Sequence, residues 1–197
     1  MRNVSRTARR AAARLAVILA LLGAGVLPAC DLNKVLDVHV PGKVPEEALD
    51  NPELALTLTR GVIADLECSW NNYVAASALI SDQLIQSSGN LNQRNFGTRR
   101  VTADDPNYAT VTCRDPYGIY TTLQTARYQS EDVYKRLDGF PDAQVTNKPL
   151  LKATVRAFGG FALVALGEGF CEMALDGGPL MQPKDVLKVA EARFTDA

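Results

Sequence analysis

The 197-residue sequence contains a single histidine, His39. A Ser-His-Asp or Cys-His catalytic arrangement would depend on this one imidazole, which lies in a predicted tether. The sequence also lacks the GxxxxGKS/T phosphate-binding loop. Gly159, Gly160, Gly167 and Gly169 fall in a helical context, without the strand-turn-helix that a dinucleotide fingerprint requires. We therefore expect neither an enzyme nor a bound cofactor.

The chain has no net excess of positive charge, with 21 basic against 22 acidic residues. The balance is uneven, because residues 1–29 hold five arginines and no acid. Without that stretch, sixteen basic residues face 22 acidic ones, a net charge of −6. Nucleic-acid binding needs clustered positive charge. Nucleic acid is therefore not an expected partner.

The apolar run of residues 15–26 is too short to span a membrane, since about 20 helical residues are needed. It follows a basic stretch that ends at Arg14, as the apolar core of a secretory signal follows its basic region. The next residues, Leu27-Pro28-Ala29-Cys30, resemble the lipobox of bacterial lipoproteins, whose cysteine is acylated and becomes the first mature residue.

This order of features predicts a signal peptide over residues 1–29 and a lipid anchor, such as palmitate, on Cys30. Several acyl chains together hold a protein stably at a membrane surface. The mature chain is therefore expected to be tethered to a membrane and not embedded in it. The alternative is a plain signal peptide cleaved after Ala29, with Cys30 present by chance.

Cysteine is scarce, and the spacing of the cysteines does not indicate a metal site. Beside Cys30 the chain has Cys68, Cys113 and Cys171, with no CxxC pair and no second soft ligand nearby. A metal site is therefore not expected. Export permits disulfides, and Cys68–Cys113 is the predicted pair, which leaves Cys171 over.

The mature chain is predicted to be all-α, with tetratricopeptide-like antiparallel helical pairs and one long polar loop. Residues 30–49 indicate a lipidated tether, and residues 50–197 a helical domain. Asn51 is expected to cap the first helix, with Pro52 at its first position. Further helices are predicted at about 71–86, from 115–116 onward, at 149–175 and from 182–183 onward. The buried stripe predicted for the helix after 116 is Ile119, Leu123, Ala126, Ser130, Val133 and Leu137.

The predicted helix at 149–175 is apolar around nearly its whole circumference, so it should be buried among other helices. Gly159 and Gly160 lower its helix propensity, and we expect them to admit a closely packed neighbour. Asp176-Gly177-Gly178-Pro179 is expected to end it. Near its end, Glu168 is expected to face solvent or form an ion pair.

The polar insert at residues 88–114 is the candidate binding segment. It shows no helical period, and loops of this length in compact domains are usually functional or disordered. Amide, guanidinium and aromatic groups can bond to and stack on polar organic ligands. The candidate ligand residues are Asn92, Arg94, Phe96 and Tyr108. The alternative is a solvated surface loop. Trp70 and Tyr73 are expected in the core or an interface.

Three segments resemble the RagB/SusD family of outer-membrane nutrient-binding lipoproteins. The mature start, Cys30 to Pro41, is similar to a lipidated cysteine followed by an LD-V-P stretch. Residues 117–120 with Ala126 are similar to a YxxI-xAN helix. The most specific segment is RAFGGFALVALG at 156–167, with Gly178-Pro179-Leu180 after it. It departs from the family in Gly159-Gly160, where an aromatic pair is usual.

The resemblance implies an outer-membrane lipoprotein without catalytic activity. It would bind a glycan or other oligomeric nutrient and pass it to a SusC-like, TonB-dependent transporter. Part of the ligand site would come from the 88–114 insert. Family members are longer, so the resemblance implies the N-terminal part of a larger protein. The alternative is a helical-repeat scaffold lipoprotein of the envelope that binds no small ligand.

Overall fold

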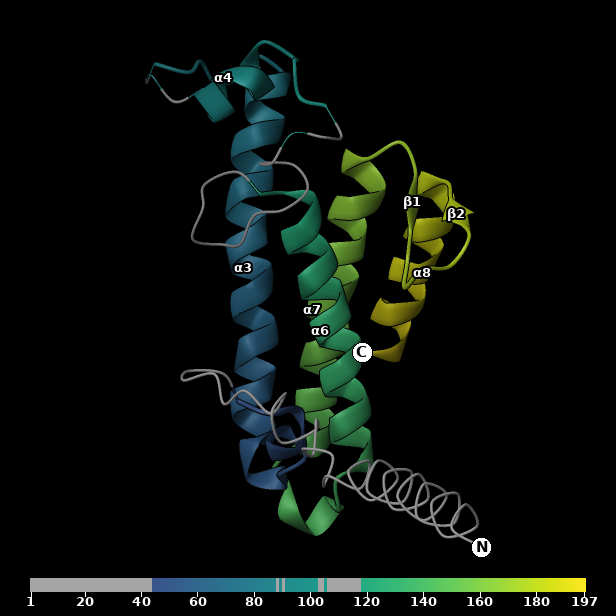
Figure 1. The fold of residues 1–197 in the computed structure, drawn as a ribbon. Coiled ribbons are helices and arrows are strands. Elements are labelled where there is room, and N and C mark those ends of the chain that lie inside the picture. The colour runs from purple at the N-terminus through teal and green to yellow at the C-terminus, as the bar shows by residue number, and fades with distance from the viewer. Residues whose placement is uncertain (1–43, 88, 90, 103–104, 106–117) are drawn as a thin grey trace, which may run out of the picture. The chain divides into compact units, whose positions relative to one another are not determined.

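A computed structural model describes residues 44–197, except 88, 90, 103–104 and 106–117. The chain divides into two compact units, Met1–Val44 and Pro45–Ala197. The predicted signal peptide, Cys30 and His39 all lie outside the described residues, as do Tyr108 and Cys113. The second unit confirms the all-α prediction, because its one sheet is a pair of two-residue strands (Figure 1).

The first long helix is α3 (Ala55–Ile80). The Asn51 side chain accepts a hydrogen bond from the Glu53 amide, and a short 3-10 helix at Pro52–Leu54 leads into α3. This confirms the predicted cap. The separate helix expected at 71–86 is wrong, because α3 runs unbroken through that point. Neither glycine nor proline interrupts residues 62–80, and the buried Asn72 donates across to the carbonyl of Gly118.

The next long helix is α6 (Tyr120–Gly139), and its buried face confirms the predicted stripe. All six positions are buried: Ile119, Leu123, Ala126, Ser130, Val133 and Leu137. The positions lie three and four residues apart, so they line one side of the helix. At its far end Arg136 bonds to Asp132 in the same helix and to Asp50 and Glu46. These ion pairs hold the 3-10 helix Glu46–Leu49, a segment that the sequence predicts as an extended tether.

The central helix α7 (Lys148–Gly169) ends six residues before the predicted Leu175. Met173–Ala174 (β1) and Leu180–Met181 (β2) pair antiparallel instead. Asp176 and Gly177 turn the chain between them, both with positive φ, at 52° and 70°. The predicted helix stop at Asp176 is therefore a hairpin turn, because aspartate and glycine tolerate the left-handed conformation that such a turn requires.

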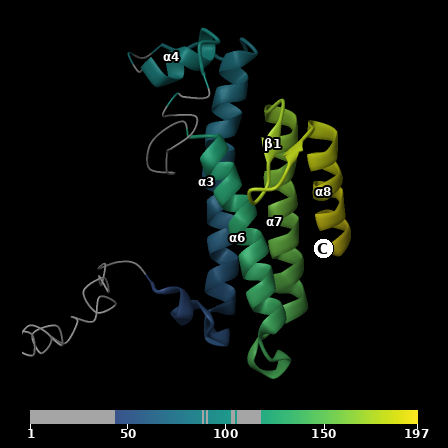
Figure 2. The ribbon, with the colours of Figure 1, turned by 45° about the vertical axis from the view of Figure 1, so that its right-hand side comes forward.

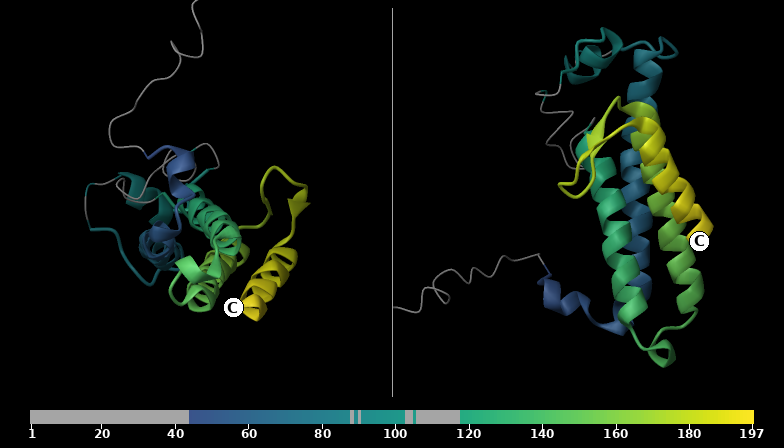
Figure 3. Two further views of the ribbon diagram at one scale, coloured as in Figure 1. Left: turned by 90° about the horizontal axis from the view of Figure 1, so that it is seen from below. Right: turned by 90° about the vertical axis from the view of Figure 1, so that its right-hand side faces the viewer.

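The last helix, α8 (Pro183–Asp196), starts at the predicted Gln182-Pro183. It packs on α7, which also contacts α6 and α3 (Figure 2). Each of these four helices runs opposite to the one before it in the chain. Seen along the helices, α3, α6 and α7 pack together, and α8 lies beside α7 (Figure 3). Within the described residues, α7 alone is long and apolar enough to cross a membrane, and nearly half of that stretch is buried in the bundle.

The two central glycines of α7 mark close contacts with neighbouring helices. A Cβ on Gly159 would lie 2.8 Å from the Cβ of Ser130, and one on Gly160 would lie 2.8 Å from the ring of Phe194. Gly159 therefore faces α6, whereas Gly160 faces α8. The close approach predicted from these small residues is confirmed.

The polar insert contains a short helix, α4 (Leu91–Gly97), which contacts α3. The expectation of no helix in this segment is wrong. Phe96 is 2% exposed and belongs to the same apolar cluster as Leu79, Leu123 and Leu166. A single buried ring fixes α4 to the bundle, and one such position carries no periodicity that a sequence pattern could reveal.

Candidate functional site

A cleft of about 620 Å³ opens where α3, α4 and the end of α7 meet. Tyr73 of α3 and Phe170, just beyond α7, contribute aromatic rings to its lining. Phe96 and Val101 enter from the insert, and Glu168 and Glu172 add two carboxylates. The predicted insert and the apolar helix thus meet at one cavity of the size of small-molecule sites.

Close packing positions the two partly exposed rings of the cleft. A Cβ on Gly169 would lie 2.7 Å from the ring of Tyr73, so the ring can pack here only because residue 169 has no side chain. Phe170 meets Tyr120 edge to face, with ring centroids 5.2 Å apart. Both contacts hold the rings before a ligand arrives, which lowers the entropy cost of binding.

The charge of the cleft is acidic. Gln182 donates a 2.7 Å hydrogen bond to Oε1 of Glu172. Glu168 is exposed and has neither a hydrogen bond nor an ion pair with another described residue. Burial and the charge of Glu168 raise the pKa of the Tyr73 hydroxyl, so this hydroxyl stays protonated and can donate. The described part of the chain holds no group of three or more potential metal-ligating side chains.

The four predicted ligand residues are not gathered in this cleft. Phe96 lies in its lining but is buried in the core, so little of its ring is open to a ligand. Arg94 lines a neighbouring hollow of about 410 Å³, together with Asp82 and Thr98. The side chain of Asn92 and the whole of Tyr108 lie outside the described residues.

Sequence reasoning missed the residues that give the cleft its chemistry. Tyr73, expected in the core or an interface, is a partly buried lining residue. Glu168 faces solvent, as expected, but does so at the cleft. Phe170 and Glu172 stand in a segment assigned to the interior of a helix. The available signal was the sequence Glu168 to Glu172, where two acids flank an aromatic ring after a long uncharged stretch.

The cysteines divide into bonded and free. Cys68 on α3 is disulfide-bonded, and Cys171, at the cleft, is exposed and free. The partner of Cys68 lies outside the described residues. The Cys68–Cys113 pairing therefore stays a prediction.

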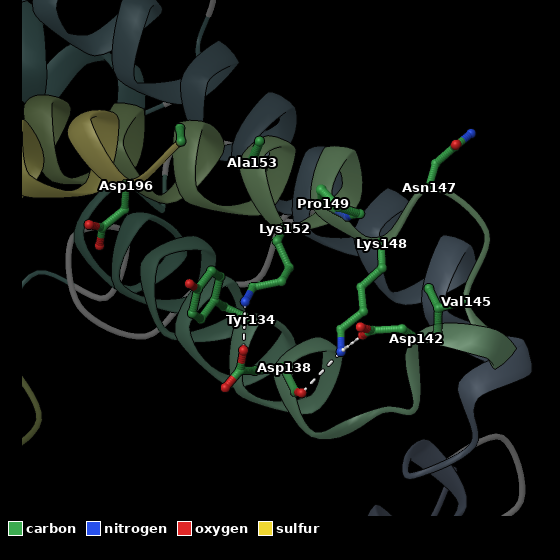
Figure 4. A pocket seen from close by; sticks show the side chains of 11 residues that line it. Tyr134, Asp138, Asp142, Val145, Asn147, Lys148, Pro149, Lys152, Ala153 and Asp196 are labelled. Atoms are coloured by element: carbon green, nitrogen blue, oxygen red, sulfur yellow. Dashed lines mark hydrogen bonds and ion pairs between the residues drawn. The ribbon is translucent and has the colours of Figure 1, made fainter.

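A larger hollow, of about 850 Å³, lies at the other end of α7 (Figure 4). Its charged groups are already paired. Lys148 donates to the carbonyl oxygens of Asp138 and Phe140 and pairs with Asp142 at 2.7 Å. Lys152 pairs with Asp138 at 2.6 Å and lies 4.6 Å from the ring centre of Tyr134. These contacts tie α6 to α7 across their connecting turn.

The pKa values at this turn shift in the direction expected for paired charges. A hydrogen bond from Lys152 lowers the pKa of Asp138, and one from Lys148 lowers that of Asp142. The bond with Asp138 in turn raises the pKa of Lys152. All these charges are directed at one another and not at the hollow, so we assign the larger hollow a structural role.

Comparisons with family models, with curated proteins and with solved structures find no match to this chain. The function must therefore be argued from the chemistry of its own residues.

Proposed function

We propose that this chain is an exported, lipid-anchored binding protein that captures a glycan or other oligomeric nutrient. It delivers that ligand to a TonB-dependent outer-membrane transporter. The observation that carries the proposal is the aromatic and acidic cleft at the junction of α3, the 88–114 insert and the end of α7. The resemblance to RagB/SusD proteins supports it, because that resemblance implies a ligand surface on the same insert.

The chemistry of the cleft suits a polyhydroxylated ligand. Aromatic rings offer flat apolar faces against which the C–H face of a sugar ring packs. Ionised carboxylates accept hydrogen bonds from hydroxyl groups, and the protonated Tyr73 hydroxyl can donate one. Tyr73 of α3 and the segment that holds Phe170 and Glu172, just after α7, supply these functions from two separate parts of the chain.

The anchor and the transporter rest on the sequence. The basic stretch, the short apolar run and Leu27-Pro28-Ala29-Cys30 support export and lipidation of Cys30. A tether on Cys30 would keep the helical unit at the membrane surface, within reach of a transporter in the same membrane.

Binding by the full-length chain, purified in detergent, tests this function. Isothermal titration against a panel of neutral and charged oligosaccharides should find one that binds. Tyr73→Phe keeps the ring that packs on Gly169 and removes only the hydroxyl, so we expect the dissociation constant to rise about three- to tenfold. Phe170→Ala should weaken binding about tenfold or more, because it removes a ring of the cleft.

The matched control is Tyr128→Ala, which removes a 55% exposed aromatic ring on α6. Tyr128 does not line the cleft, so the control should bind like the unaltered chain. Equal weakening by Tyr128→Ala and Phe170→Ala would contradict the assignment of this cleft.

One observation favours the scaffold alternative. Trp70, Phe161 and Phe194 are 42%, 49% and 37% exposed, on α3, α7 and α8 respectively. Phe161 meets Phe194 edge to face at 5.2 Å, and a hollow of about 230 Å³ lies between Phe161 and Trp70. Exposed apolar patches of this kind often mark protein interfaces. A photo-crosslinker at position 161 that captures an envelope protein, with no oligosaccharide bound, would favour the scaffold.

A further inference from the structure

We infer that the cleft selects a cationic ligand, an oligomer that carries ammonium groups, such as an oligomer of an amino sugar. This inference rests on the proposed function, because it names the class of nutrient that the same cleft would take. Three features carry it: a cavity with aromatic walls, two carboxylates in its lining, and the end of a long helix beside them.

The cavity is the first step of the argument. It is concave, about 620 Å³ in volume, and lined by the core residues Ala76 and Ile119 as well as by Tyr73 and Phe170. Such a site can cover the apolar face of a ligand on several sides, while the carboxylates at its rim stay in contact with water. An ammonium group beside an aromatic face also gains cation–π attraction.

The second step is the state of the two carboxylates. Glu168 has no ion pair with a described residue, and among these residues Glu172 bonds only to the neutral amide of Gln182. Elsewhere in the described residues, Asp138, Asp142 and Asp176 each bond to a lysine or arginine. The cleft thus keeps two negative charges without a cation from the described chain.

The third step is the electric dipole of α7. A helix carries about half a negative charge at its C-terminus, and a basic side chain in the last turn commonly offsets it. The last turn of α7 contains no basic residue, and the helix ends at Gly169, in the lining of the cleft. A cationic ligand would occupy the position that a lysine or arginine takes at other helix ends.

No described residue that lines the cleft is a lysine, arginine or histidine. The insert does carry cations, but Arg99 is paired with Asp82, and Arg94 lines the neighbouring hollow. An anionic oligomer would therefore meet negative charge without compensation, and like charges are repelled.

The test compares three probes on the full-length chain: the tetramers of glucosamine, of N-acetylglucosamine and of galacturonic acid. They are cationic, neutral and anionic. We expect the cationic tetramer to bind about tenfold tighter than the neutral one, because it can pair with two solvent-exposed carboxylates. The anionic tetramer should bind weakest. The preference should shrink as salt is added, because salt screens exposed charges.

Two isosteric variants separate the inference from folding and from the proposed function. Glu168→Gln and Glu172→Gln should each reduce the cationic preference about threefold, with unchanged thermal unfolding. Glu191→Gln, on the exposed face of α8 and outside the cleft, should leave it intact. Equal binding of the cationic and neutral tetramers would overturn the inference and leave the proposed function standing. Absence of binding by all three would also overturn the inference, whereas only a failure of the whole oligosaccharide panel would count against the proposed function.

Discussion

Gly159 of α7 faces Ser130 of α6 so closely that a Cβ on the glycine would lie 2.8 Å from the Cβ of the serine. Both residues are buried at the centre of the bundle. The glycine that weakens α7 as an isolated helix therefore sets how near α6 can come.

Replacing this glycine should destabilise the protein. Gly159→Ala improves helix propensity but forces a clash with Ser130, and overpacking of this kind costs about 1–3 kcal/mol. Gly61→Ala is the matched control, because it lies on the exposed side of α3 with no atom within 4 Å of its would-be Cβ. That change should raise the unfolding free energy by about 0.5–1 kcal/mol. Urea unfolding followed by circular dichroism measures both, and a stabilised Gly159→Ala variant would contradict the close contact.

Phe96 is expected to contribute mainly to the stability of the core. Removing its buried ring by Phe96→Ala should lower the unfolding free energy by about 3–5 kcal/mol. Leu91→Ala, on the same short helix but 67% exposed, should change it by less than about 0.5 kcal/mol. The same urea titration compares the two. Equally small losses of unfolding free energy in the two variants would show that Phe96 does not fix α4 to the bundle.

Lys148 should stabilise the turn between α6 and α7. Lys148→Met leaves the carbonyl oxygens of Asp138 and Phe140 without their donor, and we expect a loss of about 2 kcal/mol in unfolding free energy. Lys188→Met is the control, since Lys188 is 70% exposed and its one ion pair within the described part of the chain is with Asp185. Thermal unfolding of both variants measures the difference in stability between them. Equal stability of the two variants would show that packing alone holds the turn.

The ion pair between Arg127 and Asp176 should make stability depend on pH in the acidic range. Two 2.8 Å hydrogen bonds from the buried Arg127 hold the pKa of Asp176 below its ordinary value of 3.8. A carboxylate with a lowered pKa stabilises the fold above its unfolded pKa, and that stabilisation disappears as pH falls through the lowered value.

Asp176→Asn keeps a residue that tolerates positive φ and removes only the charge. The unaltered chain should be more stable than this variant at neutral pH, and the difference should narrow below about pH 4. Urea unfolding at a series of pH values measures it. A difference that is constant with pH would mean that the charge of Asp176 contributes nothing.

Thiol labelling tests the disulfide. Without reductant, iodoacetamide should modify the exposed Cys171 and leave Cys68 unmodified. Peptide mapping should then recover Cys68 joined to Cys113. A peptide that joins Cys68 to Cys30 would contradict both the predicted pair and the lipid anchor. Cys171→Ser serves as the control, because it should abolish labelling without affecting the mapped disulfide.

The sequence by itself determined those parts of the fold that follow from local order. The cap at Asn51, the helix start at Gln182-Pro183 and the buried stripe from Ile119 to Leu137 all depend on residues close together in the chain. Helix periodicity and capping are properties of one segment, so a single sequence reveals them. Gly159 and Gly160 predict a close helix contact from local sequence as well, because only glycine lacks a Cβ.

Only the tertiary structure decided where the helices end and which residues form the cleft. α3 continues past residue 71, and the buried Asn72 in it bonds to the carbonyl of Gly118, in a distant segment. The end of α7 gives way to a hairpin whose turn Arg127 holds from α6. Tyr73 and Phe170 share a cleft although 97 positions separate them in the chain. Such long-range contacts have no local signature, because they depend on how whole helices pack.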